Sequence, residues 1–121
     1  MWYEMKIRTM PDSTDRVAEA TIAPDSPWFD GHFPNQPVLP GIAQLEMVFD
    51  LIRRYASRPL RIAEVSRVRF KRMIVPEDRV TIVATPRPAN ANVYTFRLEK
   101  ADGLVTTGTM TVETTTEETD N

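Results

Sequence analysis

Apolar and polar residues alternate with a period of two through most of the chain after residue 60. Such alternation is typical of strands with one buried face. Between the last two alternating segments, Asp102 and Gly103 form a hairpin-turn signal. Strands joined by short turns predict an antiparallel sheet. The apolar positions that define the strands are Val68 and Phe70; Val80, Ile82 and Ala84; Tyr94, Phe96 and Leu98; and Gly108, Met110 and Val112.

One segment, from Gly41 to about Ala56, has the period of a helix instead. Pro40 precedes it and is well suited to a helix start, and apolar residues cover much of the helix circumference. A helix that is apolar this far round is expected to be enclosed by other elements. Its polar residues fall together on one narrow side, and they are Glu46, Asp50 and Arg53.

The order of these elements indicates the fold class. A short, imperfect strand pattern over residues 16–23 comes first, followed by a long loop, the enclosed helix and three to four long strands. This order predicts an α+β domain in which an antiparallel sheet wraps around one long central helix. We find no internal repeat, so residues 1–113 are expected to form one domain. Residues 114–121 are polar and acidic and are expected to be a disordered tail.

Composition excludes several classes of function. The chain has 121 residues, a net charge of −2 and a pI of about 5.4, which argue against a globally basic nucleic-acid-binding protein. It has one histidine and no cysteine, so no disulfide and no transition-metal site are expected. Without a phosphate loop or a dinucleotide fingerprint, no cofactor is expected either. The chain shows no signal peptide and no membrane-spanning stretch, which favours a cytoplasmic protein.

The only histidine, His32, lies in a proline-rich loop directly before the predicted helix. Five of the ten prolines fall between residues 24 and 40, and each fixes a backbone angle, so this loop should have a defined shape. Glu46 follows 14 residues after His32, on the helix. By residue type alone, a lone histidine beside aromatic residues is more often structural, and Glu46 is more often part of a solvated helix face.

The loop and the helix together carry a specific motif. The segment GHFPNQPVLPGIAQLE, residues 31–46, resembles the active-site segment of the 3-hydroxyacyl-acyl-carrier-protein dehydratases of the hot-dog superfamily. Downstream, VRFKRMIVPEDRV, residues 68–80, resembles a strand and turn of the same family. The resemblance implies a hot-dog fold, dehydratase activity and a homodimer in which His32 and Glu46 of one site come from different chains. The matching loop and helix positions are Gly31, His32, Phe33, Pro34, Pro37, Pro40, Gly41, Leu45 and Glu46.

Three features depart from the family pattern. Asn35 and Gln36 follow the His-Phe-Pro motif where the family usually has glycine first, and Glu77 replaces the glycine of a Pro-Gly-Asp turn. The chain also lacks the longer N-terminal segment of the members that act in fatty-acid synthesis. We therefore expect it to resemble the shorter accessory members of specialised lipid, polyene or polyketide pathways.

Dehydration of a 3-hydroxyacyl thioester requires a base for the C2 proton, an acid for the C3 hydroxyl group and donors for the thioester oxygen. A neutral imidazole serves as a base near pH 7, and a carboxyl group kept protonated by burial serves as an acid. Backbone amides at a helix N-terminus stabilise an oxyanion. Together with the resemblance, these requirements predict His32 as the base, Glu46 as the acid and the Gly41 amide as the oxyanion donor.

Other residues are expected to contact the substrate or its carrier, which is either acyl carrier protein or coenzyme A. By default Arg67, Arg69 and Lys71 are a solvated strand face, but a shared face would also suit the acidic surface of acyl carrier protein. The residues expected to contact the acyl group are Phe33, Pro34, Val38 and Trp28.

Two other functions stay open at this point. A hot-dog thioesterase would use a carboxylate on the central helix to activate water, and would release a free acid instead of an enoyl thioester. A hot-dog protein that binds an acyl chain or acyl carrier protein without turnover would not hydrate an enoyl thioester at all.

Overall fold

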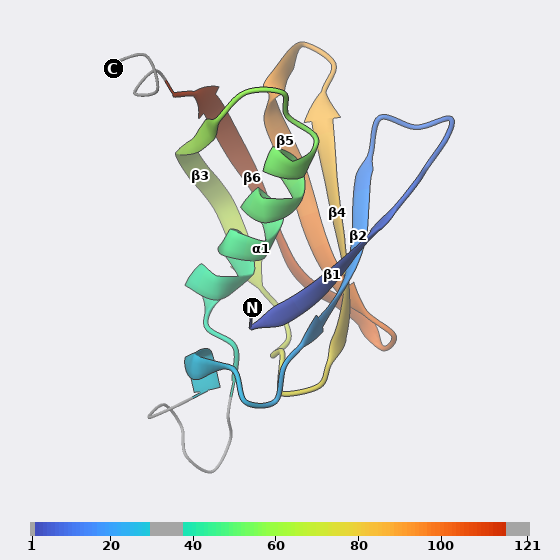
Figure 1. Ribbon diagram of the computed structural model, residues 1–121, viewed down its shortest axis with the longest axis vertical. Coiled ribbons are helices and arrows are strands. Elements are labelled where there is room, and N and C mark those ends of the chain that lie inside the picture. The colour runs from blue at the N-terminus through green and yellow to red at the C-terminus, as the bar shows by residue number, and fades with distance from the viewer. Residues whose placement is uncertain (1, 30–37, 116–121) are drawn as a thin grey trace.

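The computed structural model describes residues 2–29 and 38–115, and in these residues a six-stranded antiparallel sheet curves around one α-helix (Figure 1). The sheet order is β1-β2-β4-β5-β6-β3, so β1 and β3 are its two edges. The predicted α+β architecture is confirmed. The elements in chain order are β1 (Tyr3–Arg8), β2 (Arg16–Ile22), the 3-10 helix η1 (Pro27–Phe29), α1 (Gly41–Arg54), β3 (Leu60–Phe70), β4 (Arg79–Arg87), β5 (Asn90–Lys100) and β6 (Gly103–Thr114).

β1 is a strand that was not predicted from the sequence. It pairs with β2 through six residues, from Tyr3 opposite Ile22 to Arg8 opposite Val17. A signal for it was present, because Tyr3, Met5 and Ile7 alternate with charged residues in the sequence. The strand matters for the site described below, because it forms the sheet edge opposite β3.

The helix α1 lies against the concave face of the sheet, with β3 on one side and β1 on the other (Figure 1). Burying each large apolar side chain on its inner side contributes about 1.5–3 kcal/mol. The predicted enclosure is confirmed on all but one side, where Ile42, Glu46 and Arg53 are exposed. None of the described helices is long and apolar enough to cross a membrane. The inward-facing apolar residues, each at most 1% exposed, are Ala43, Met47, Val48, Leu51 and Ile52.

The edge strand β3 contains two irregularities that change which residues face the helix. Its register with β6 shifts between Ile62 and Glu64 and again between Ser66 and Arg69. At the second shift Arg67 has a φ of 58°, in the left-handed region. Each bulge adds a residue to the strand and so reverses the alternation that follows. The inward positions of β3 are consequently spaced by three, three and two residues, and they are Ile62, Val65, Val68 and Phe70.

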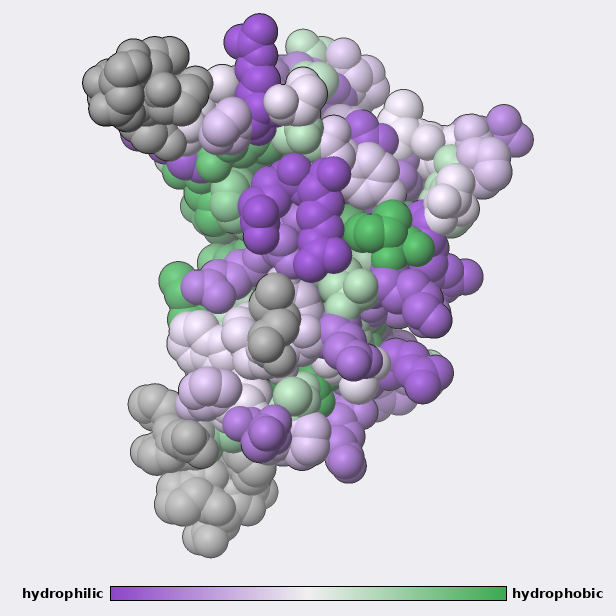
Figure 2. All heavy atoms as spheres, in the orientation of Figure 1, coloured by the Kyte–Doolittle hydropathy of each residue, from purple (hydrophilic) through white to green (hydrophobic). Residues whose placement is uncertain are grey.

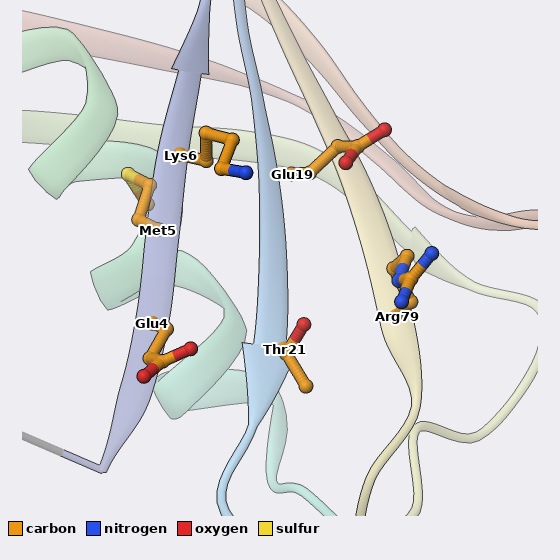
Figure 3. Close-up of a pocket in the computed structure, with 6 residues that line it drawn as sticks. All are labelled: Glu4, Met5, Lys6, Glu19, Thr21 and Arg79. Carbon is orange, nitrogen blue, oxygen red and sulfur yellow. The ribbon is translucent and has the colours of Figure 1, made fainter.

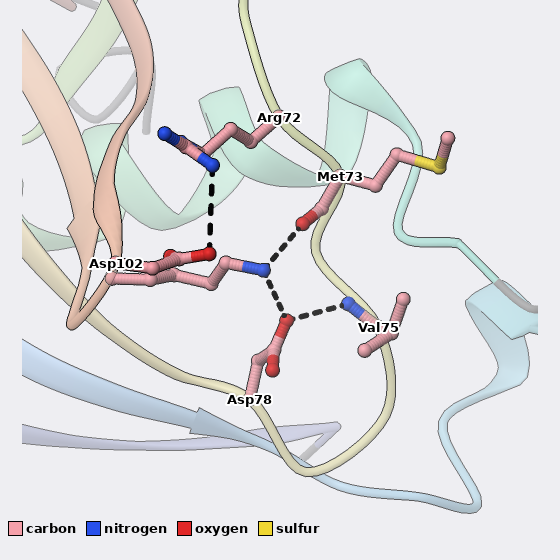
Figure 4. A network of polar contacts seen from close by, with 6 residues as sticks. Arg72, Met73, Val75, Asp78 and Asp102 are labelled. Carbon is pink, nitrogen blue, oxygen red and sulfur yellow. Dashed lines mark hydrogen bonds and ion pairs between the residues drawn. The ribbon is translucent and has the colours of Figure 1, made fainter.

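The loop between β3 and β4 is held against the end of β5 by a polar network (Figure 4). Lys100 Nζ lies 3.0 Å from Asp78 Oδ2 and donates a hydrogen bond of 2.7 Å to the carbonyl group of Met73. The Val75 amide donates to the same Asp78 oxygen at 2.9 Å. In this loop Glu77 has a φ of 72°, a conformation that favours glycine. The network therefore holds this strained turn against the end of β5.

Candidate active site

The predicted catalytic histidine lies outside the described residues, as do Phe33 and Pro34 of the same loop. The structure does describe both ends of that segment. Phe29 ends η1 and is buried. Leu39, two residues before α1, is also buried and donates its amide to the Ile74 carbonyl at 2.8 Å. The segment that carries His32 is thus anchored in the core at each end.

Glu46, the predicted acid, lies in the second turn of α1 with its side chain exposed. It lines a groove of about 300 Å³ that runs along the open side of the helix. The lining residues come from the N-terminal edge of the sheet, from α1 and from β3, so the groove is bounded by both sheet edges. These residues are Trp2, Tyr3, Glu46, Phe49, Asp50, Arg53 and Ile62. Of these residues, only Glu46 was predicted from the sequence to belong to a site.

Two of the predicted acyl contacts, Trp28 and Val38, are described by the structure, and neither lines this groove. The Trp28 ring meets the Trp2 ring edge-on, with 6.0 Å between their centroids, and Trp2 in turn lies 4.4 Å from Tyr3. Trp28 is half-buried and packs against the core. Val38 is half-buried beside Leu39. The structure therefore gives Trp28 a packing role behind Trp2, which itself lines the groove.

A charged cluster of Tyr3, Asp50, Arg53 and Arg54 lies beside the groove, one helical turn beyond Glu46. The Asp50 side chain is 6% exposed, accepts a hydrogen bond from the Tyr3 hydroxyl group, and accepts another of 2.9 Å from Arg54 Nη2. Its second oxygen lies 2.7 Å from Arg53 Nη2, as an ion pair outside hydrogen-bonding geometry. In the space-filling view, hydrophilic side chains gather over this end of α1 (Figure 2). The cluster joins β1 to the helix beside the groove.

The electrostatics of the cluster follow from burial and from these partners. Burial raises the pKa of Tyr3, and its hydrogen bond to the Asp50 carboxylate raises that pKa further. Burial by itself would raise the pKa of Asp50, but the bonds from Arg54 and Tyr3 and the arginine charges lower it overall. Asp50 is therefore an anion at neutral pH and keeps both arginines on this side of the helix.

Gly41 is the first residue of α1, as predicted, and its surroundings are unusual. Pro40 is the N-cap and provides no side-chain hydrogen bond, and the first turn has no acidic residue. The amides of Ala43 and Gln44 both donate to the Pro40 carbonyl, at 3.1 and 3.2 Å. Among the described residues, no acceptor is found for the Gly41 amide. A Cβ atom at Gly41 would lie 2.5 Å from Phe70 Cζ, so a larger residue here would require the Phe70 ring to move.

The three basic residues at the end of β3 are all exposed, but they do not continue one regular strand face. Arg69 pairs with Thr107 on the outer face of the sheet, whereas Arg67 is the bulge residue and Lys71 follows the end of the strand. The alternation that the sequence predicted is interrupted because the bulge inserts an extra residue. The residues still form one exposed basic segment.

A second hollow, of about 610 Å³, lies on the outer face of β1, β2 and β4 (Figure 3). Its lining carries charges of both signs: Lys6 is opposite Glu19 in the sheet, and Glu19 lies 3.2 Å from Arg8 beside the hollow. It contains none of the predicted site residues. Among the described residues, no group of three or more His, Cys, Asp or Glu side chains is placed to hold a metal ion.

Comparison with known proteins identifies the family of the chain. A family model for ApeI-like proteins, described as ApeI dehydratase, matches residues 8–109. The 3-hydroxyacyl-acyl-carrier-protein dehydratase FabZ of Sorangium cellulosum is 32% identical over 111 residues, covering 75% of this chain and 72% of that protein. The FabZ of Streptococcus pyogenes serotype M3 is 33% identical over 104 residues, covering 78% and 75%.

A solved structure shows the same fold. One chain of the dehydratase heterocomplex ApeI:P from Xenorhabdus doucetiae is similar with a TM-score of 0.75 and 22% identity, covering 90% of this chain and 93% of that chain. The expected hot-dog fold, with the sheet wrapped around a central helix, is confirmed.

Proposed function

Because the chain belongs to the ApeI-like dehydratase family, we propose that it removes water from 3-hydroxyacyl thioesters to give trans-2-enoyl thioesters. The observation that carries the proposal is the position of Glu46. Its helix is enclosed on every side but one, yet this carboxyl group is exposed and lines the groove along that open side. The residue also stands 14 positions after His32 in a motif similar to that of the family.

In the proposed reaction, the neutral imidazole of His32 takes the proton from C2, and the electron pair of that bond forms the C2=C3 double bond. The C3–O bond breaks, and Glu46 donates a proton to the departing hydroxyl group, which leaves as water. Negative charge grows on the thioester oxygen during proton removal. The Gly41 amide, at the uncapped start of α1, is suited to stabilise it because the first amides of a helix lack intrahelical acceptors.

A carboxyl group acts as an acid near neutral pH only when its surroundings keep it protonated, and burial has this effect. Glu46 is exposed in the single chain, so covering the groove would favour its role. We propose that a second copy covers it. The edge strand β3 has only β6 as a neighbour among the described strands, and its Ile62 lines the groove with Glu46. A copy that pairs along β3 would lie beside Glu46 and could contribute its own His32.

We further propose acyl carrier protein as the carrier. The exposed segment that contains Arg67, Arg69 and Lys71 is locally basic on a chain with a net charge of −2. Such a segment attracts an acidic partner and increases the rate of encounter.

The experiment is to assay the purified chain with a 3-hydroxyacyl thioester on acyl carrier protein and, in reverse, with an enoyl thioester. H32A and E46Q should each lose nearly all turnover while the fold is kept. E4Q removes an exposed carboxylate on the opposite face of the sheet and should keep full activity. Release of free acid would identify a thioesterase, and the absence of any turnover would indicate a binding protein.

Mixing tests whether the site is shared between chains. H32A and E46Q are unfolded and refolded together, so about half of the dimers become heterodimers, and in each of these one of the two sites carries neither change. Roughly a quarter of the wild-type activity should return, since acid and base act as one unit. If heterodimers form but stay inactive, His32 and Glu46 of one site come from the same chain, or Glu46 is not the acid.

A further inference from the structure

Phe70 is an exposed aromatic residue whose position the core does not explain. Its side chain is 54% exposed, and it is not among the apolar side chains that pack against the described core. The tip of its ring instead lies over Gly41, and three ring carbons would be 2.5–3.2 Å from a Cβ atom at that position. The contact therefore joins the last residue of β3 to the first residue of α1.

The strand geometry directs the ring to this place. The bulge at Arg67 restores Phe70 to the inner face of the sheet, where it pairs with Thr106 of β6. The Thr106 hydroxyl group donates a hydrogen bond to the buried Gln44 side chain of α1. Phe70 and Thr106 thus both contact the first turn of the helix from the same end of the sheet.

Gly41 depends on such a contact more than another residue would. Glycine has the largest conformational freedom, and Pro40 gives the helix start no side-chain cap. The Gly41 amide shares a peptide plane with the Pro40 carbonyl, which the Ala43 and Gln44 amides hold within the helix. Where this first turn lies relative to the sheet depends on what packs against it, and among the described side chains the Phe70 ring lies nearest to the Cβ position of Gly41.

We propose that Phe70 is a positioning residue, which holds the first turn of α1, and with it the Gly41 amide, in place against the thioester oxygen through contact between its ring and Gly41. The inference rests on the proposed dehydratase function. A donor stabilises an oxyanion only when it lies close to the position where charge develops, and an apolar wall strengthens that interaction by excluding water. A misplacement of about 1 Å in such a group lowers the rate by about a hundredfold.

The test compares F70A with I42A in steady-state turnover of a 3-hydroxyacyl thioester. Ile42 is a matched control, because it is 61% exposed, apolar and in the same helical turn. F70A should lower kcat by about ten- to a hundredfold with KM changed by less than about twofold, since the lost interaction forms only in the transition state. I42A should keep kcat within about twofold of the wild type. F70L should recover part of the lost kcat, and it replaces F70A if F70A does not fold.

The outcomes separate this inference from the proposed function. A wild type without turnover overturns the proposed function, and this inference with it. If the wild type is active and E46Q is inactive, but F70A and F70L both keep the kcat of I42A, only the inference is wrong. A rise in KM that accounts for the whole loss would mean that the ring binds substrate and does not orient the amide.

Discussion

Replacing Asp50 with asparagine should destabilise the fold, because Asp50 is the acceptor of the charged cluster between β1 and α1. Its side chain is 6% exposed and bonds the Tyr3 hydroxyl group and Arg54. Hydrogen bonds to charged groups contribute about 1.5–3 kcal/mol. Asparagine keeps an acceptor for Tyr3, and Arg53 and Arg54 are 55% and 36% exposed, so water replaces part of what they lose. We expect D50N to lower the free energy of unfolding by about 1–2 kcal/mol.

A double-mutant cycle with Y3F tests the magnitude and the coupling. Y3F removes the hydroxyl donor and should cost about 1 kcal/mol. The two changes share one hydrogen bond, so the double variant should lose less than the sum of the single losses by at least about 0.5 kcal/mol. Urea denaturation followed by circular dichroism measures all four proteins. E19Q, in the exposed pair with Arg8, serves as the control and should change stability by less than about 0.5 kcal/mol.

The pH dependence of the same variants gives an independent check. The folded-state pKa of Asp50 is lowered, so its contribution is fully present above the ordinary value of 3.8 and is lost as pH falls through the lower folded value. The stability difference between wild type and D50N should therefore shrink below about pH 4. Additive losses in the cycle together with a difference that does not change with pH would refute the hydrogen-bonded cluster.

Three further predictions concern the loop and the end of β3. A triple charge reversal of Arg67, Arg69 and Lys71 should slow turnover of carrier-protein substrates by about tenfold at low salt and spare small thioester mimics; equal slowing of both would exclude docking at this segment. E77G should raise the free energy of unfolding by roughly 0.5 kcal/mol, because glycine adopts the left-handed conformation without strain but also gains freedom in the unfolded chain. If urea denaturation instead shows a lower free energy of unfolding, the Glu77 side chain itself stabilises the turn. K100M should lower the free energy of unfolding by about 1–2 kcal/mol in the same assay, since Lys100 bonds both Asp78 and the Met73 carbonyl. R72M breaks only the exposed pair with Asp102, of 3.5 Å, and should lower it by less than about 0.5 kcal/mol. Equal losses in these two variants would contradict the role of the half-buried Lys100 network.

The sequence alone was sufficient to predict those features that depend on residues close together in the chain. The apolar period of the segment after Pro40 determined that α1 begins at Gly41 and is enclosed. Alternation and the Asp102–Gly103 turn determined the β5–β6 hairpin, in which Lys100 pairs with Gly103. The motif around His32 and Glu46 was enough to predict the family. Because each of these features depends on residues near one another in the sequence, a local residue pattern predicts it directly.

The groove and its contacts required the tertiary structure. Tyr3 meets Asp50 across 47 positions, and no local pattern relates the two residues. Trp2 and Ile62 line one groove only because the sheet curves until its opposite edges flank the same helix.

The ring of Phe70 lies over Gly41 because of an extra residue in β3. The sequence placed Phe70 on the face of Val68, and this was correct, but a regular strand from Val65 would have turned both residues outward. The bulge at Arg67 changes the alternation by one residue and restores them to the helix side. A one-residue change in register reverses every side chain that follows, and it is set by pairing with β6 and not by the β3 sequence itself.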